Sequence, residues 1–293
     1  TITTHYKRKR GISMFKRKKL NFFVAMIMVM TLMFGSTICF ATENNNEILQ
    51  IYGLFAEKGY TREDVDEMFT KDELSDFIGA TSISINNKYY KISPDDDVSE
   101  VSENVVIQNV ENSIALQSSD VQKTADGYFQ GTVVLADMGN DNYRISYTGR
   151  WLIEPENRNV DVAALFVDNI SILQGTVKAY YSAQKNNRGA LSVVTQNFLY
   201  DTTSKSIGGT FDLYEDDLMN GITYEKQYVY ITVEGKMDLR ATNIVSAWGE
   251  YYHQQKTIEV TPKITLSEIS IDMTYKKYMK QMLNNPYTTE LID

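Results

Sequence analysis

Cysteine and histidine are almost absent from this chain, and their scarcity excludes several kinds of site. The 293 residues contain one cysteine, Cys39, and two histidines, His5 and His253. A cysteine protease, a disulfide-stapled scaffold, a thiolate zinc site and a multi-histidine metal centre each need more of these side chains. Beyond residue 41, a Ser-His-Asp hydrolase would have to use His253.

Catalytic signatures are absent as well. The sequence contains no glycine-rich phosphate loop, no HExxH, no GxSxG and no paired CxxC. We therefore assign no catalytic, cofactor-binding or metal-ligating residue. A glycan-active hydrolase stays open, because two carboxylates that the fold brings together leave no local pattern.

Proline is scarce, with 4 residues, whereas hydrophobic residues make up 43% of the chain and aromatic residues 12%. A chain of this composition buries a core, so disordered, collagen-like and low-complexity classes are excluded. Beyond residue 41, 21 basic residues face 38 acidic ones, a net charge of −17. Nucleic acid and anionic lipid are repelled by such a surface. We predict no nucleic-acid partner, and membrane contact only through the first 41 residues.

Those first residues have the order of a secretory signal peptide. Counted from Met14, which we expect to be the true start, a basic stretch at 16–19 precedes an uncharged apolar run at 20–34. Small residues follow, and we expect cleavage after Ala41. The segment predicts export, with a secreted or cell-surface location.

Two alternatives to cleavage are open. Residues 22–41 reach about the 20 residues that span a bilayer, so the segment also fits an uncleaved anchor. Lipidation at Cys39 is the other, although Ile38 is larger than the residue that usually precedes a lipidated cysteine.

Residues 42–98 are predicted to form a small helical segment, a strand pair and an acidic linker. A first helix is indicated by apolar residues at helical spacing (Ile48, Ile51, Tyr52 and Phe55) and ends at Gly59. Two further helices are expected to start at Thr61 and Thr70, each with an acidic residue three positions later that completes a capping box. Helices this short need a partner surface. They pack on each other and on the β-domain, or they form an exposed module that docks another protein.

The strand pair is predicted over residues 83–92, with its turn at Asn86 and Asn87. Five acidic residues follow within 95–103 and indicate a solvated loop. A weak extracellular calcium site is the alternative, because hard cations bind several carboxylates, but the spacing matches no known calcium loop.

From about residue 105 to 274 the hydrophobic period is two. Tyr143, Ile145 and Tyr147 lie on one face of a predicted strand, and the residues between them lie on the other. Many such strands, separated by polar turns and without intervening helices, predict a mainly β fold: an antiparallel β-sandwich, immunoglobulin-like or jelly-roll-like. We place the sandwich domain at 99–275, after the segment at 42–98, and a polar tail at 276–293.

Tyrosine is abundant, with 20 residues, and supplies the one candidate binding face. When Val229 and Ile231 face the core, Tyr228 and Tyr230 point outward, and Tyr180 belongs to a similar strand. Outward tyrosines stack on sugars or anchor peptides. The alternative is that tyrosine is present because it favours strands.

His253 lies near the end of another predicted strand. A general base or a pH-sensitive contact is the functional interpretation, and a solvated or simply hydrogen-bonded residue is the structural one. We do not assign it as catalytic.

The segments KGYTREDV at 58–65 and TKDEL at 70–74, together with residues 151–165, resemble uncharacterised exported proteins of Gram-positive bacteria. In that group a similar helix start precedes a β-rich part. The resemblance implies export and supplies no activity.

Three functions follow from these patterns. The first is a secreted or cell-surface, non-catalytic β-sandwich that binds a cell-wall polymer or a protein partner. The second is a membrane-active protein, pore-forming or bacteriocin-like, with residues 104–134 as its amphipathic hairpin. The third is a glycan-active hydrolase that uses two carboxylates.

Overall fold

The computed structural model describes residues 46–92, 98–116, 127–154, 158, 160–238, 244–254, 264–266, 271–273, 279–281 and 289–292. The chain divides into two compact units, residues 1–53 and 54–293. Of the first unit, residues 46–53 are described, and they are helical. No helix within the described ranges has the length and apolar character to cross a membrane. The predicted signal segment lies outside those ranges.

The second unit is built mainly of strands. Its helices are α2 (Arg62–Met68), α3 (Lys71–Ser75), α4 (Glu103–Leu116) and the 3-10 turn η1 (Gln174–Thr176). Its strands are β1 (Ser82–Ile92), β2 (Val98–Val101), β3 (Gly127–Asp137), β4 (Asn142–Ile153), β5 (Val160–Asp168), β6 (Ile170–Ile172), β7 (Lys178–Asn187), β8 (Ala190–Asn197), β9 (Tyr200–Thr202), β10 (Ser206–Asp212), β11 (Ile222–Met237), β12 (Ile244–Gln254), β13 (Ile264–Leu266), β14 (Ile271–Met273), β15 (Met279–Gln281) and β16 (Thr289–Ile292).

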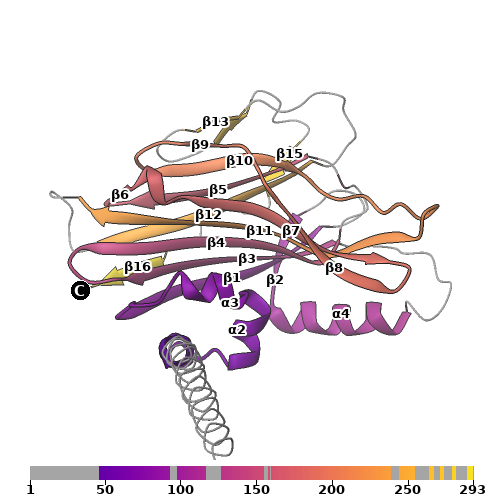
Figure 1. Cartoon of the computed structure of the whole chain (residues 1–293), viewed down its shortest axis with the longest axis horizontal. Helices are drawn as coiled ribbons and strands as arrows, with labels where there is room; N and C mark the ends of the chain where they lie inside the picture. Colours follow the sequence, from indigo (N-terminus) through magenta and orange to yellow (C-terminus); the bar gives the residue numbers. More distant parts are fainter. Residues whose placement is uncertain are drawn as a thin grey trace, which may run out of the picture. The chain divides into compact units, whose positions relative to one another are not determined.

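Two antiparallel sheets form the sandwich. Among the described strands, sheet A has the order β2-β1-β3-β4-β11-β7-β8, with β6 also paired to β11. Sheet B has the order β15-β12-β5-β10-β9, with β16 paired to β12, and β13 pairs with β14. Figure 1 shows sheet B on one side of sheet A, and α2 and α3 on the other side. The predicted mainly β sandwich, preceded by a small helical segment, is confirmed.

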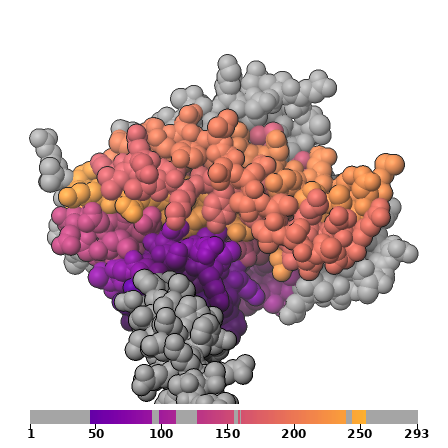
Figure 2. All heavy atoms as spheres, in the orientation of Figure 1, coloured from indigo at the N-terminus to yellow at the C-terminus, as the bar shows by residue number. Residues whose placement is uncertain are grey.

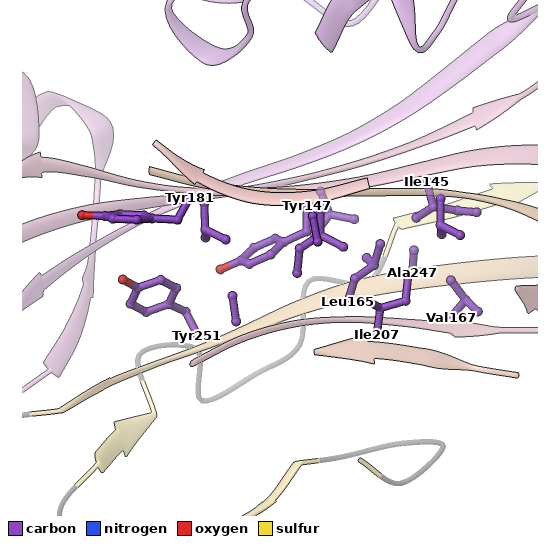
Figure 3. Packing of buried hydrophobic residues seen from close by; sticks show 14 of the residues in the cluster. Ile145, Tyr147, Leu165, Val167, Tyr181, Ile207, Ala247 and Tyr251 are labelled. Atoms are coloured by element: carbon purple, nitrogen blue, oxygen red, sulfur yellow. The ribbon is translucent and has the colours of Figure 1, made fainter. Parts of the chain in front are cut away.

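The core lies between the two sheets and follows from the two-residue period of the strands. Figure 3 shows Ile145, Tyr147 and Tyr181 of sheet A facing Leu165, Ile207 and Tyr251 of sheet B. Glycine is required at one point of this contact, because a Cβ atom on Gly249 would overlap the ring of Tyr147. We call the core-facing side of sheet A its inner face and the opposite side its outer face.

The helical segment at residues 54–80 folds as its capping residues predict. Thr61 and Thr70 each complete a capping box, with Asp64 and Glu73 as the third helical residues. Gly59 has φ +90, the left-handed conformation that favours glycine after a helix. Apolar side chains of the segment pack on one another: Phe55, Phe69 and Phe77 have ring centroids 5.7 to 6.4 Å apart.

The predicted turn at Asn86 and Asn87 is wrong. β1 runs straight through both residues and pairs with β3 along its whole length. The side chain of Asn87 accepts hydrogen bonds from Gln130 (3.1 Å) and Thr132 (2.9 Å), so an amide that usually favours turns is satisfied across the strands. The predicted strand pair within residues 83–92 is therefore one strand, and β1 pairs instead with β2 and β3. The solvated loop predicted over residues 95–103 is only partly described: residues 93–97 lie outside the described ranges, whereas residues 98–101 form β2 and Glu103 begins α4.

The amphipathic hairpin proposed for residues 104–134 is not formed. This stretch contains α4 and the first part of β3, and residues 117–126 between them are outside the described ranges. β3 is a buried strand that pairs with β1 on one side and β4 on the other. Insertion into a membrane would therefore have to break two antiparallel ladders. The domain boundaries at 98/99 and 275/276 stay predictions.

Candidate functional site

The three tyrosines of the predicted binding face do lie together. Tyr180 and Tyr230 are directly opposite each other on β7 and β11, with ring centroids 5.4 Å apart. Tyr228 makes an edge contact with Tyr180 at 6.3 Å. All three belong to the outer face of sheet A, because their neighbours Val229, Ile231 and Tyr181 point into the core.

Two members of this tyrosine cluster, Tyr180 and Tyr230, contact the helical segment. Tyr230 is fully buried, and its hydroxyl donates to Asp76 at 3.2 Å. Tyr180 is partly buried and donates to Glu73, itself a buried residue that closes the capping box of α3. Burial, followed by the nearby carboxylates of Asp76 and Glu73, raises the pKa of Tyr230 well above its usual value. Tyr230 has no solvent access, whereas Tyr180 and Tyr228 are only partly buried, and the binding face stays a prediction.

Two basic residues complete the contact. Lys178 of β7 forms an ion pair with Asp76, and Arg150 of β4 donates to the backbone carbonyl of Met68 at 3.2 Å. The Arg150 guanidinium also lies 5.1 Å from the ring centroid of Tyr228. Burial lowers the pKa of Arg150. These interactions are the polar part of the contact between the helical segment and the sheet.

Several buried polar atoms under the helical segment lack partners. Within the described part of the chain, Ser146 Oγ, Thr148 Oγ1 and Arg150 Nε form no hydrogen bond. All three residues lie on the outer face of β4, opposite the core-facing Ile145 and Tyr147. Unsatisfied buried polar groups cost about 1–3 kcal/mol each. The core-facing Tyr147 hydroxyl is also unpaired among the described residues, so this cost is not confined to the outer face.

His253 belongs to a buried polar network inside the sandwich. Its Nδ1 lies 2.9 Å from Asp161 Oδ1, and the hydroxyl of Tyr251 donates to the other oxygen of Asp161. Trp151 Nε1 donates to that same hydroxyl at 3.0 Å. Because His253 is 2% exposed, the solvated interpretation is wrong and the hydrogen-bonded one is confirmed. The geometry is that of a structural network with its polar groups paired in the core.

A shallow polar hollow lies at the β1–β2 edge of sheet A. Its volume is about 260 Å³, and Tyr60, Asn87, Tyr89, Glu100 and Glu103 are among its lining residues. Tyr89 donates to Glu103 at 2.6 Å, while Lys88 and Glu100 pair at 3.2 Å. No cluster of metal-ligating side chains is found in the ranges that the structure describes.

The opposite edge of sheet A is apolar and open. β8 pairs with β7 and with no other described strand. Leu191 is 64% exposed and Val193 73% exposed, and their register opposite Asn186 and Gln184 places both on the outer face. β8 has the sequence ALSVVTQN, without a charge or a proline, the usual devices that protect an edge strand.

A second exposed apolar pair lies in a turn that is bonded to the tip of the β7–β8 hairpin. Leu218 and Met219 are 75% and 97% exposed, in the turn that leads into β11. Arg188, at the tip of the β7–β8 hairpin, fixes the turn: its backbone N–H donates to Gly221 and its side chain to Asn220, at 3.0 and 3.2 Å. In Figure 2 the salmon and orange atoms at the right of the view belong to this part of the chain. We call Leu191, Val193, Leu218 and Met219 the apolar edge.

The apolar edge was not predicted from the sequence. The signal was present, because a strand of eight residues without charge is unusual in a chain with 23% charged residues. Strand order was needed to show that this strand lies at an edge, and sequence alone did not supply it.

No protein-family model matches the sequence, and no curated protein matches it. Solved structures with weak similarity include the pilus backbone of Streptococcus pneumoniae, at 14% identity and a TM-score of 0.25, aligned over 42% of this chain and 45% of that one. The collagen-binding domain of a Staphylococcus aureus adhesin aligns at 9% identity, a TM-score of 0.20, and 37% and 75% coverage. The collagen-binding domain of an Erysipelothrix rhusiopathiae surface protein aligns at 6% identity and a TM-score of 0.25, over 53% of this chain and 64% of that one.

These similar structures are surface proteins of Gram-positive bacteria. The chain spans less than half of the pilus protein and about two thirds of the Erysipelothrix domain. At such TM-scores the likeness carries no argument about function. The function has to be argued from the molecule itself.

Proposed function

We propose that this protein is an exported, non-catalytic β-sandwich that acts at or near the cell surface and binds a protein partner through its apolar edge. Export is supported by the basic, apolar and small-residue order of the first 41 residues. The observation that carries the binding role is the exposure of Leu191 and Val193 on an unprotected edge strand.

The chemistry of the edge favours an extended protein segment as the partner. An edge strand offers a row of backbone donors and acceptors, which a second strand can pair with. The exposed leucine and valine side chains then supply apolar contact for alternate residues of that strand. A polysaccharide would instead be recognised by exposed aromatic rings, and of the clustered tyrosines Tyr230 is fully buried and Tyr180 and Tyr228 are partly buried.

Co-sedimentation with isolated Gram-positive cell walls tests this proposal. The purified chain is mixed with untreated walls, with protease-treated walls and with liposomes, each with and without calcium. We expect binding to untreated walls that protease treatment reduces by about tenfold or more, and no binding to liposomes.

Variants locate the binding surface. Leu191→Lys and Val193→Lys place charges on the open edge, which is how edge strands are normally protected, and are expected to abolish sedimentation. Ser99→Lys on β2, the other edge strand of sheet A, is the matched control and should bind like the parent chain. Binding that survives both β8 variants would contradict the apolar edge. Equal binding to untreated and protease-treated walls would contradict a protein partner and would indicate a cell-wall polymer instead.

Sedimentation with liposomes would favour the membrane-active alternative, and release of reducing sugar from the walls would favour the glycan-active hydrolase. The absence of binding to every preparation would contradict a role at the cell wall.

A further inference from the structure

The outer face of sheet A carries a compact set of groups that suits anions. Lys178, Arg150, Tyr180 and Tyr230 all point away from the core and supply ammonium, guanidinium and hydroxyl donors. They are gathered from three neighbouring strands, β4, β11 and β7. In a chain whose exported part has a net charge of −17, this set is an isolated cationic and donor-rich surface.

The groups that occupy this surface are two acidic side chains of the same chain. Glu73 and Asp76 lie three residues apart, so both can face one side of the α3 turn. Glu73 accepts from Tyr180, and Asp76 accepts from Tyr230 and pairs with Lys178. The helical segment is therefore bound to the sheet in the manner of an acidic ligand.

The polar groups of this face are only partly paired among the described residues. Ser146 Oγ, Thr148 Oγ1 and Arg150 Nε are buried on this face and have no hydrogen-bond partner among the described residues. The phenylalanine side chains of the segment pack on one another rather than supplying the contacts to these polar groups. The segment has a small aromatic core of its own and is held to the sheet in part by these charged and hydroxyl groups, so an acidic competitor would meet the same groups.

We infer that the outer face of sheet A is a binding surface for an acidic protein segment, with Lys178, Arg150, Tyr180 and Tyr230 as its receptor groups, and that residues 54–80 occupy it as an intramolecular ligand. The partner is a peptide that presents two carboxylates about one helical turn apart. While the segment is docked, its high effective concentration, about millimolar for a short tether, excludes a dilute competitor.

A labelled synthetic peptide with the sequence of residues 54–80 is the probe. Fluorescence anisotropy compares its binding to the parent chain and to the double variant Glu73→Gln, Asp76→Asn. That variant removes both carboxylates from the intramolecular ligand, while glutamine at position 73 keeps the capping box. We expect the variant to bind the peptide at least about tenfold more tightly than the parent chain does.

Three controls keep the result specific. Adding Lys178→Met to the double variant should abolish the gain, whereas adding Lys185→Met, on the same strand but outside the contact, should preserve it. A peptide carrying glutamine and asparagine in place of its two acids should bind at least tenfold more weakly than the native peptide. Near-ultraviolet circular dichroism confirms that each chain has kept its aromatic core.

Equal, weak binding by the parent chain and the folded double variant would overturn the inference. So would equal binding of the acidic and the neutral peptide. An equal response to a sulfated glycan would make the face a general polyanion site and would overturn the peptide assignment. None of these outcomes involves the apolar edge, so they are distinguishable from a failure of the wall-binding proposal.

Discussion

The two faces of sheet A bury tyrosine in opposite ways. On the inner face Tyr147 and Tyr181 pack among apolar side chains of sheet B, with glycine at the closest approach to Tyr147. On the outer face Tyr230 is equally buried, but its hydroxyl donates to the carboxylate of Asp76 and its ring packs against Tyr180. Strands with the same two-residue alternation thus bury tyrosine in an apolar core on one face and beside charged groups on the other.

The difference shows which of the two contacts the fold depends on. Burial of apolar area stabilises by about 25 cal/mol per Å², whereas a buried hydrogen bond contributes only about 0.5–1.5 kcal/mol net. We therefore expect the inner face to resist change until global unfolding, and the outer face to open first.

Alkaline pH should have the largest effect and should separate the faces. Burial raises the pKa of Tyr147, Tyr251 and Tyr230 well above 10.0 in the folded chain. Above pH 10 the unfolded chain loses these protons while the folded chain keeps them, so stability is present below pH 10 and is lost as the pH rises. For each pH unit above 10, each tyrosine lowers the free energy of unfolding by about 1.4 kcal/mol, and the three together lower it by roughly 4 kcal/mol.

Tyrosinate absorbance at 295 nm and far-ultraviolet circular dichroism, measured together, check this. In the parent chain we expect an early rise in absorbance when the outer face opens and Tyr230 ionises, before the chain unfolds. The Tyr230→Phe variant should lose this early step, and Tyr251→Phe should alter only the main transition. Ionisation of all tyrosines near pH 10 in a chain that stays folded would contradict the expected burial.

Removal of Asp161 should break the inner network. Asp161→Ala leaves the Tyr251 hydroxyl and His253 Nδ1 without their carboxylate inside the core. We expect a loss of about 3–5 kcal/mol in the free energy of unfolding, as for other buried charged partners. Urea denaturation measures it, with Asp201→Ala, an exposed acid of β9, as the control.

A methyl group on Gly249 tests the closest approach of the two sheets. Its Cβ would overlap the Tyr147 ring, so Gly249→Ala should destabilise by about 1–3 kcal/mol through overpacking. Gly175→Ala is the matched control, because nothing lies within 4 Å of that position. Equal midpoints in urea for the two variants would argue against this packing.

A substitution on the outer face should lower the free energy of unfolding by less. Tyr230→Phe removes one hydroxyl that donates to Asp76 and should cost about 1 kcal/mol. Hydrogen exchange should speed up in residues 62–75 and stay unchanged in β3. Global unfolding without this local change would contradict a separable helical segment.

Charges on the apolar edge should have the smallest effect on stability. Val193→Lys changes a side chain that is 73% exposed, so the midpoint should stay within about 0.5 kcal/mol of the parent chain. Analytical ultracentrifugation at high concentration measures whether the edge also pairs two copies. If the parent chain dimerises and the Val193→Lys variant stays monomeric, a second copy of the chain is one partner that binds at β8.

Much of the local structure was predictable from short stretches of sequence. The capping boxes at Thr61 and Thr70 and the helix end at Gly59 depend on residues within one turn of each other. The alternation in residues 143–151 predicted which side chains of β4 enter the core. The turn prediction at Asn86 and Asn87 was wrong because the side chain of Asn87 accepts a hydrogen bond from Thr132 on the neighbouring strand.

What the sequence determined by itself was the period of each strand, the helix starts and the scarcity of cysteine and histidine, because these depend on residue identity and near neighbours. Only the tertiary structure decided that the outward-pointing Tyr230 is buried, that His253 meets Asp161 from 92 residues away, and that β8 is an edge. Each of these depends on which distant surface packs against a strand. Alternation gives the direction of a side chain, and the fold supplies what the side chain meets.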